Sequence, residues 1–77
     1  MTSLSDLQVG DTARILGYGE GGASYRRKLL SMGITPGVSI SLTRLAPLGD
    51  PVEIRLRGFA LSLRKDEAKA LLVEKLA

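Results

Sequence analysis

Residues 38–64 read VSISLTRLAPLGDPVEIRLRGFALSLR, and the alternation within this stretch decides the fold. Apolar and polar residues alternate in three runs, at residues 38–45, 52–57 and 59–64. Such alternation gives a strand one face for water and one for a core, as in antiparallel sheets. The apolar positions are even as far as Leu56 and odd from Phe59 onward, so Gly58 must absorb a slip of one residue in a tight turn or bulge. The pattern therefore places Phe59 in the core.

The sequence before this stretch predicts one more strand and a helix. Residues 12–18 alternate in the same way and are predicted as a strand. Residues 25–32 are predicted as a helix, with Ser24 as its N-cap, because their apolar side chains recur at helical spacing. The core-facing stripe of this helix consists of Tyr25, Leu29 and Met32. Gly33 is placed to end the helix in the left-handed conformation, and a type II turn is expected over residues 35–38.

Around these elements the chain predicts only short segments. Helical turns are expected over residues 3–7 and 66–70, and a last strand over residues 71–76. Five short strands with one or two short helices predict a mainly β fold. We expect a small barrel of antiparallel strands, because closure hides the edges of a small sheet. An open sheet covered by one helix is the alternative.

Composition narrows the class of protein. The chain has 77 residues, enough for a single domain over residues 1–77, and 44% of them are apolar. His and Cys are both absent, which excludes disulfides, thiolate and imidazole metal ligands, and the usual nucleophile–base pairs. We therefore expect no enzymatic activity, no cofactor and no tight metal site. A cytoplasmic location is expected, because the chain has no long apolar run and lacks the disulfides that small secreted domains usually need.

A glycine-rich segment, GYGEGG over residues 17–22, matches the dinucleotide-binding pattern G-x-G-x-x-G. The acid that such a site needs about 20 residues further on is missing, and Glu20 would repel a pyrophosphate. We therefore interpret the segment as a loop between strand and helix rather than as a nucleotide site.

The predicted helix opens with a cluster of cations that is a candidate binding surface. Arg26, Arg27 and Lys28 lie in its first turn, where positive charge opposes the helix dipole. Solvated surface charge explains this cluster as readily as a docking face for an acidic partner does. Beside the cations, Tyr25 and Leu29 either pack in the core or present an apolar anchor to a partner, and both interpretations stay open at this point.

A loop with two prolines, APLGDP over residues 46–51, is the second candidate surface. Its prolines fix the backbone, so the loop loses little entropy if it binds a partner. Leu48 stands in this loop, where it either folds back on the core or is free for a partner, and Asp50 is its charged residue. The candidate partner-binding residues are Tyr25, Arg26, Arg27, Leu29, Leu48 and Asp50.

Three segments carry a family resemblance: RKLLSMGITPG at residues 27–37, APLGDPVE at residues 46–53, and RGF followed by LSLRK within residues 57–65. They resemble the ferrous iron transport protein A family, FeoA, and the resemblance covers almost the whole chain. It implies an SH3-like barrel, similar to the domain that ends some metal-dependent repressors. It also implies a cytosolic accessory protein of bacterial ferrous iron uptake. The expected partner is the large membrane transporter of that system, FeoB, which carries a cytosolic GTPase domain.

The resemblance favours a protein-interaction module that acts on FeoB and reaches the membrane only through that partner. No DNA-binding domain precedes the barrel, which favours the free-standing accessory protein over a repressor. One alternative is a metal-responsive domain that binds a transition metal ion weakly through carboxylates. The other is a small nucleic-acid-binding barrel. A net charge of +3 and only three aromatic residues offer few contacts to phosphates and bases, so nucleic acid is not expected as a partner.

Overall fold

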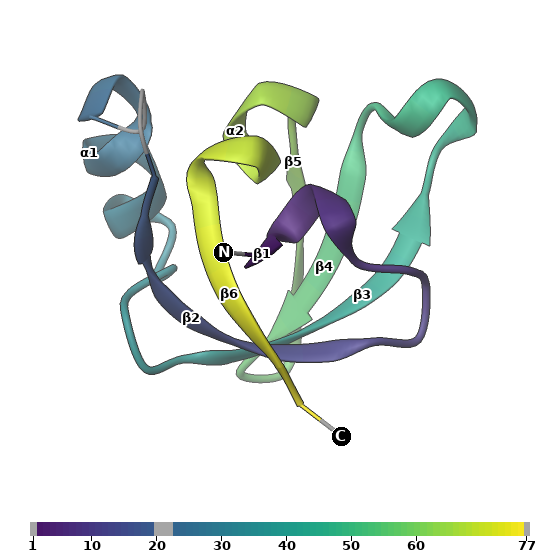
Figure 1. The fold of residues 1–77 in the computed structure, drawn as a ribbon, viewed down its shortest axis with the longest axis horizontal. Helices are drawn as coiled ribbons and strands as arrows, with labels where there is room; N and C mark the ends of the chain where they lie inside the picture. The colour runs from purple at the N-terminus through teal and green to yellow at the C-terminus, as the bar shows by residue number, and fades with distance from the viewer. Residues whose placement is uncertain (1, 20–22, 77) are drawn as a thin grey trace.

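The computed structural model describes residues 2–19 and 23–76, which form one six-stranded antiparallel sheet with short helices around it. In chain order the elements are β1 (Thr2–Ser3), the 3-10 turn η1 (Leu4–Asp6), β2 (Thr12–Tyr18), α1 (Ala23–Ser31), β3 (Ser39–Leu45), the 3-10 turn η2 (Pro47–Gly49), β4 (Val52–Leu56), β5 (Phe59–Leu63), α2 (Lys65–Ala70) and β6 (Leu71–Leu76). The strand order across the sheet is β1-β6-β2-β3-β4-β5. Figure 1 shows the strands wrapped around one interior.

The five predicted strands, four of them from alternation, are all present, and each end lies within one residue of its predicted position. The sixth strand is β1, a two-residue pairing of Thr2 and Ser3 with β6. Two residues are too few to show alternation, so this strand had no sequence signal. The helical turns predicted near the two ends of the chain are confirmed as η1 and α2.

Two bulges bend the strands so that the sheet can curl. The pairing register shifts between Ile15 and Gly17 where β2 meets β6, and between Leu42 and Arg44 where β3 meets β4. An extra residue on one strand of an antiparallel pair increases the local twist and bends the strand. At the open seam between the two ends of the sheet, α2 links β5 to β6 and packs against η1 and β1.

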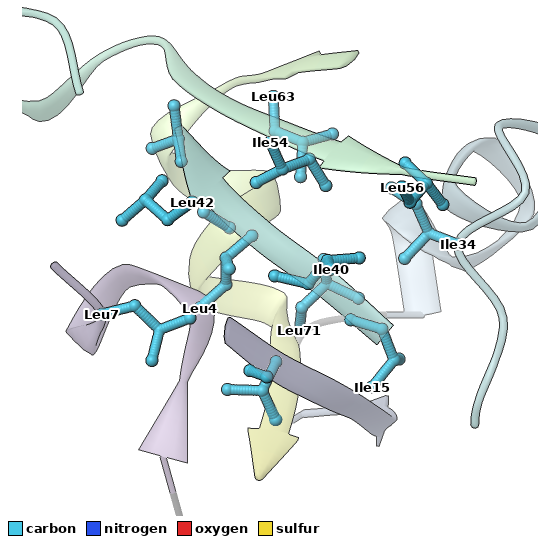
Figure 2. Packing of buried hydrophobic residues seen from close by; sticks show 14 of the residues in the cluster. Leu4, Leu7, Ile15, Ile34, Ile40, Leu42, Ile54, Leu56, Leu63 and Leu71 are labelled. Carbon is cyan, nitrogen blue, oxygen red and sulfur yellow. The ribbon is translucent and has the colours of Figure 1, made fainter. Parts of the chain in front are cut away.

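The core fills the inside of this curled sheet, as Figure 2 shows. Its largest fully buried side chains are Leu4, Ile15, Leu29, Ile34, Ile40, Leu42, Ile54, Leu56, Leu63, Leu71 and Val73. Leu4, Leu29 and Ile34 come from η1, α1 and the loop after α1, and the strands contribute the others at alternate positions, as the sequence pattern predicts. Because full burial of one such side chain is worth roughly 1.5–3 kcal/mol, this cluster is the main source of stability.

Phe59 corrects the sequence prediction. Its side chain was expected in the core, but it is 45% exposed, whereas Leu63 on the same face of β5 is fully buried. Phe59 begins β5, directly after the turn, and β5 is the last strand of the sheet. Alternation predicts which face a side chain takes, but not whether a neighbouring strand covers it.

The C-terminal end of α1 is built as predicted, but its start is not. Gly33 has φ +86°, and the amides of Gly33 and Ile34 donate to the carbonyls of Leu30 and Leu29, both at 3.0 Å. These two bonds are the Schellman arrangement, which satisfies carbonyls that the helix leaves unpaired. At the other end α1 begins at Ala23, so Ser24 lies inside the first turn and is not the N-cap.

Two tight turns also agree with the sequence. Val38 donates its amide to the carbonyl of Thr35 at 3.1 Å, and Gly37 has φ +94°, as a type II turn requires. Between β4 and β5, Arg57 (φ +49°) and Gly58 (φ +84°) form a two-residue turn that absorbs the change of parity. None of the helices in the described chain is long and apolar enough to cross a membrane.

Candidate functional site

The segments that carry the predicted partner-binding residues meet around a hollow of about 410 Å³. Figure 1 shows α2 and the η2 loop at the same end of the barrel. We call this space the polar hollow. Its lining residues are Tyr25 and Lys28 from α1, Asp50 from the η2 loop, and Arg64, Lys65, Asp66 and Glu67 at the start of α2. The structure therefore brings Tyr25 and Asp50, two of the predicted residues, to one place.

A buried carboxylate holds the wall of the polar hollow together. Glu67 is only 3% exposed, and its Oε2 lies 2.6 Å from Nζ of Lys28. Its Oε1 accepts the backbone amide of Arg64 at 2.8 Å. Burial alone would raise the pKa of Glu67, but the hydrogen bonds from Lys28 and Arg64 and their positive charges outweigh it, so the pKa falls below its ordinary value. Glu67 thus stays ionised and ties α1 to α2.

The loop is fixed to the same helix. Oδ1 of Asp50 accepts the backbone amide of Lys65 at 3.3 Å. Because Glu67 and Asp50 both accept backbone amides at the start of α2, they share the role of satisfying a helix end. Asp50 is exposed and lines the polar hollow, so its carboxylate is accessible to solvent.

The two arginines of α1 lie outside the polar hollow and are both exposed. Arg26 places its guanidinium 5.8 Å from the centre of the Tyr18 ring, within the range of a cation–π contact. The Tyr18 hydroxyl donates to the carbonyl of Ile34 at 2.7 Å, and burial raises the pKa of Tyr18 despite the nearby charge of Arg26. Neither arginine has a carboxylate partner within the part of the chain that the structure describes. Their charge is available to a partner.

Leu48 is the most exposed large apolar side chain described, at 95%. The alternative in which it folds back on the core is therefore wrong. Its φ of +71° lies in the left-handed region, which a residue with a branched apolar side chain rarely adopts. Leu48 lies at a hollow of about 200 Å³, whose lining includes Leu4 of η1 and Leu42 and Leu45 of β3. The loop thus presents an apolar side chain at its tip, at the cost of backbone strain.

Leu29 behaves in the opposite way. It is fully buried, so the interpretation of Leu29 as core side chain is correct and an exposed anchor at this position is excluded. Tyr25 and Met32, the other members of the predicted stripe, are partly buried and pack against the same cluster. Tyr25 alone of these three also lines the polar hollow.

Sequence reasoning missed Glu67 and the pair that it makes with Lys28. A local signal existed: Glu67 stands three residues after Arg64, the residue that precedes α2, which is the spacing of a capping box. The long-range partner had no signal, because no spacing relates residues of two separate helices. Lys28 thus differs from Arg26 and Arg27, although the sequence presents all three as one cluster.

The described residues contain no group of three or more His, Cys, Asp or Glu side chains that could hold a metal ion. Of the glycine-rich segment, residues 20–22 lie outside the described residues, so the structure does not test the dinucleotide pattern.

A model of the FeoA domain matches residues 2–75. The chain belongs to the FeoA family. The family is one of non-enzymatic accessory proteins of ferrous iron transport. A curated relative from Porphyromonas gingivalis is a fusion of Fe(2+) transport protein A with the Fe(2+) transporter FeoB, 39% identical over 71 residues. The match covers 92% of this chain but only 8% of that relative.

Solved structures agree with the family and with the fold. An FeoA-like protein from Clostridium acetobutylicum is 41% identical, with a TM-score of 0.88 over all of this chain and 92% of that chain. Stenotrophomonas maltophilia FeoA, described as an SH3 domain protein, is 22% identical with a TM-score of 0.80 over 96% of this chain and 91% of that chain. A manganese-dependent transcriptional repressor is 18% identical, with a TM-score of 0.88 over 97% of this chain and 36% of that chain. The last two share the fold, which is the predicted SH3-like barrel.

Proposed function

We propose that the chain is a cytoplasmic accessory protein of bacterial ferrous iron uptake that docks on the cytosolic part of FeoB. The observation that carries this proposal is the relative from Porphyromonas gingivalis, in which an FeoA protein and FeoB are one polypeptide. Fusion holds two domains at high effective concentration, which is of use when the domains act on each other. It supports an association between the same two proteins when they are separate chains.

The docking face that we propose comprises Tyr25, Arg26, Arg27, Leu48 and Asp50. Three kinds of observation support it. Arg26 and Arg27 are exposed cations without an acidic partner in the described chain, Leu48 is an exposed apolar side chain, and Tyr25 and Asp50 line the polar hollow. A central apolar anchor with cations around it is typical of protein interfaces, where the charges steer the encounter. Leu29 supports this face from inside the core.

The experiment measures association of the purified chain with the cytosolic part of FeoB at low and at physiological ionic strength. The double variant Arg26→Glu with Arg27→Glu is expected to lower the association rate constant by about tenfold or more, and to weaken its dependence on salt. The chain should stay folded, because both side chains are exposed.

A matched control reverses two cations elsewhere on the surface. Arg55 and Lys69 are both exposed and make no ion pair within the described chain, and Arg55 lies opposite Ser41 and Ala60 rather than an acid. Arg55→Glu with Lys69→Glu changes the net charge by the same amount and is expected to alter the association rate far less. Equal effects of the two double variants would mean that only net charge matters, and would contradict this docking face.

A further inference from the structure

The outer edge of β5 lacks the features that usually protect the edge of a sheet. β5 and β1 are the two edges, and β1 has only two residues. Exposed edges pair readily with other chains, and proteins blunt them with short strands, charges, prolines or bulges. β5 has five residues, FALSL, without charge, proline or glycine, and it pairs with β4 in unbroken register. One edge of the sheet is therefore blunted and the other is open.

The register shows which backbone groups this edge offers. Leu56 and Phe59 flank the two-residue turn, and in such a hairpin they exchange both hydrogen bonds. Hydrogen-bonded and non-hydrogen-bonded pairs alternate from there, so Ala60 and Ser62 direct their amides and carbonyls away from β4. Both residues are exposed, and no hydrogen bond outside the strand ladders reaches either of them within the described chain. Two amides and two carbonyls are free to pair.

The side chains around this edge indicate what would pair with it. Phe59 is 45% exposed and Leu61 is partly buried, so apolar surface is uncovered beside the free backbone groups. Arg57 lies before β5 and Arg64 follows it, and both are exposed. The acid beside the strand is Glu53, opposite Ser62 in the register. The edge is thus apolar along its length and positive at both ends.

A hollow of about 260 Å³ lies beside the second half of β5. It is lined by Lys28, Pro51, Ser62, Leu63, Arg64 and Glu67. Lys28 and Glu67 neutralise each other within it. Arg64 makes no ion pair within the described chain, and it extends the positive end of the edge.

We propose that β5 accepts an extended segment of a partner protein by strand addition, and that this segment is apolar at alternate positions and acidic at its ends. Its backbone would pair with Ala60 and Ser62, its apolar side chains would cover Phe59 and Leu61, and its acids would lie near Arg57 and Arg64. A second copy of the chain fits less well. In symmetric antiparallel pairing centred on Leu61, Arg57 of each copy would face Lys65 of the other, and like charges placed opposite each other destabilise a sheet.

This surface adjoins the docking face at Arg64, which lines both hollows, but Ala60 and Ser62 line neither the polar hollow nor that face, so the two proposals can fail independently. The probe is a synthetic eight-residue peptide, Asp-Asp-Val-Thr-Val-Thr-Asp-Asp, and the control peptide has Lys in place of every Asp. Hydrogen exchange of the whole chain is followed by NMR. In saturating acidic peptide, the amides of Ala60 and Ser62 are expected to exchange at least about tenfold more slowly, because strand addition removes them from water. The lysine peptide should leave them unchanged.

Two pairs of variants test the backbone and the charge in turn. Ala60→Pro removes an outward amide that β4 does not use, and should weaken binding of the acidic peptide by about tenfold, whereas Ala60→Val keeps the amide and should bind within about twofold. Arg57→Asp and Arg57→Asn both suit a two-residue turn before Gly58, so both should fold. The Asp variant should bind the peptide more weakly than the Asn variant.

The proposal is overturned if millimolar acidic peptide leaves the exchange of Ala60 and Ser62 unchanged, or if the lysine peptide protects them equally. It is also overturned if sedimentation without peptide shows a dimer that Ala60→Pro dissociates, since a second copy would then occupy the edge. The double variant Arg26→Glu with Arg27→Glu should bind the acidic peptide like the unaltered chain. Failure of the docking face therefore leaves this result intact.

Discussion

Helix α1 and the η2 loop each carry a leucine that the sequence presents as a possible anchor, and the structure treats the two in opposite ways. Leu29 is fully buried, whereas Leu48 is 95% exposed. Leu29 sits on a helix whose side chains recur at core spacing, so burying it costs no backbone strain. Leu48 sits at φ +71°, a conformation that a leucine adopts only when the surrounding loop imposes it. One region is built for stability, and the other presents a side chain to the outside.

The largest expected effect is on the buried side. Leu29→Ala should lower the free energy of unfolding by about 2–5 kcal/mol, because it removes buried methyl groups and leaves a cavity in the core. Leu48→Ala is the matched control, since it makes the same truncation at an exposed position and should stay within about 0.5 kcal/mol. Urea denaturation of both variants measures the difference. Equal losses would mean that Leu48 packs against the protein in solution, and would contradict this comparison.

A smaller loss is expected from the pair that ties α1 to α2. Lys28→Ala should cost about 1–3 kcal/mol, because it leaves the buried carboxylate of Glu67 with the backbone amide of Arg64 as its main partner. Arg27→Ala is the control, since Arg27 is a neighbouring exposed cation without an ion pair in the described chain. Its stability should be unchanged within error. A loss of stability in Arg27→Ala as large as that in Lys28→Ala would show that the Lys28–Glu67 pair contributes no more to stability than an exposed, unpaired cation does.

The same pair predicts how stability depends on pH. The folded-state pKa of Glu67 lies below its unfolded value, so its contribution is fully present above the unfolded pKa and is lost as the pH falls below about 4. Thermal unfolding measured between pH 3 and 7 should show stability falling on the acid side. The fall should be shallower in Glu67→Gln, which has no carboxylate to protonate. An identical slope in this variant would assign the acid sensitivity to other groups.

Most of the fold was predictable because alternation is a local signal. The five strands, the turn at Gly58 and the helix end at Gly33 each depend on residues that are close in sequence. One failure was local, because α1 begins at Ala23 and Ser24 is not its N-cap. The other was long-range: Phe59 was expected in the core, but no strand of the described sheet lies beyond β5 to cover it.

The candidate site was predictable only in part, for the same reason. The sequence nominated α1 and the η2 loop, and the structure brings Tyr25 and Asp50 to one hollow. It did not reveal Glu67, because the partner of a buried carboxylate depends on how two helices pack. Nor did it separate Lys28 from Arg26 and Arg27, since the sequence shows that all three are charged but not which of them contacts a buried carboxylate.

The smallest expected change in stability is at the tip of the η2 loop, where Leu48 has a strained backbone. Leu48→Gly places glycine at a positive φ that it adopts without strain, which relieves about 1–2 kcal/mol, but glycine also gives the unfolded chain more freedom. The net change should be a gain below about 1 kcal/mol, or none. Binding to the cytosolic part of FeoB should fall nevertheless, because the apolar side chain is gone. A variant that is no less stable and binds less would show that the strain at Leu48 is retained for binding. A loss of more than about 1 kcal/mol of stability would instead give Leu48 a packing role.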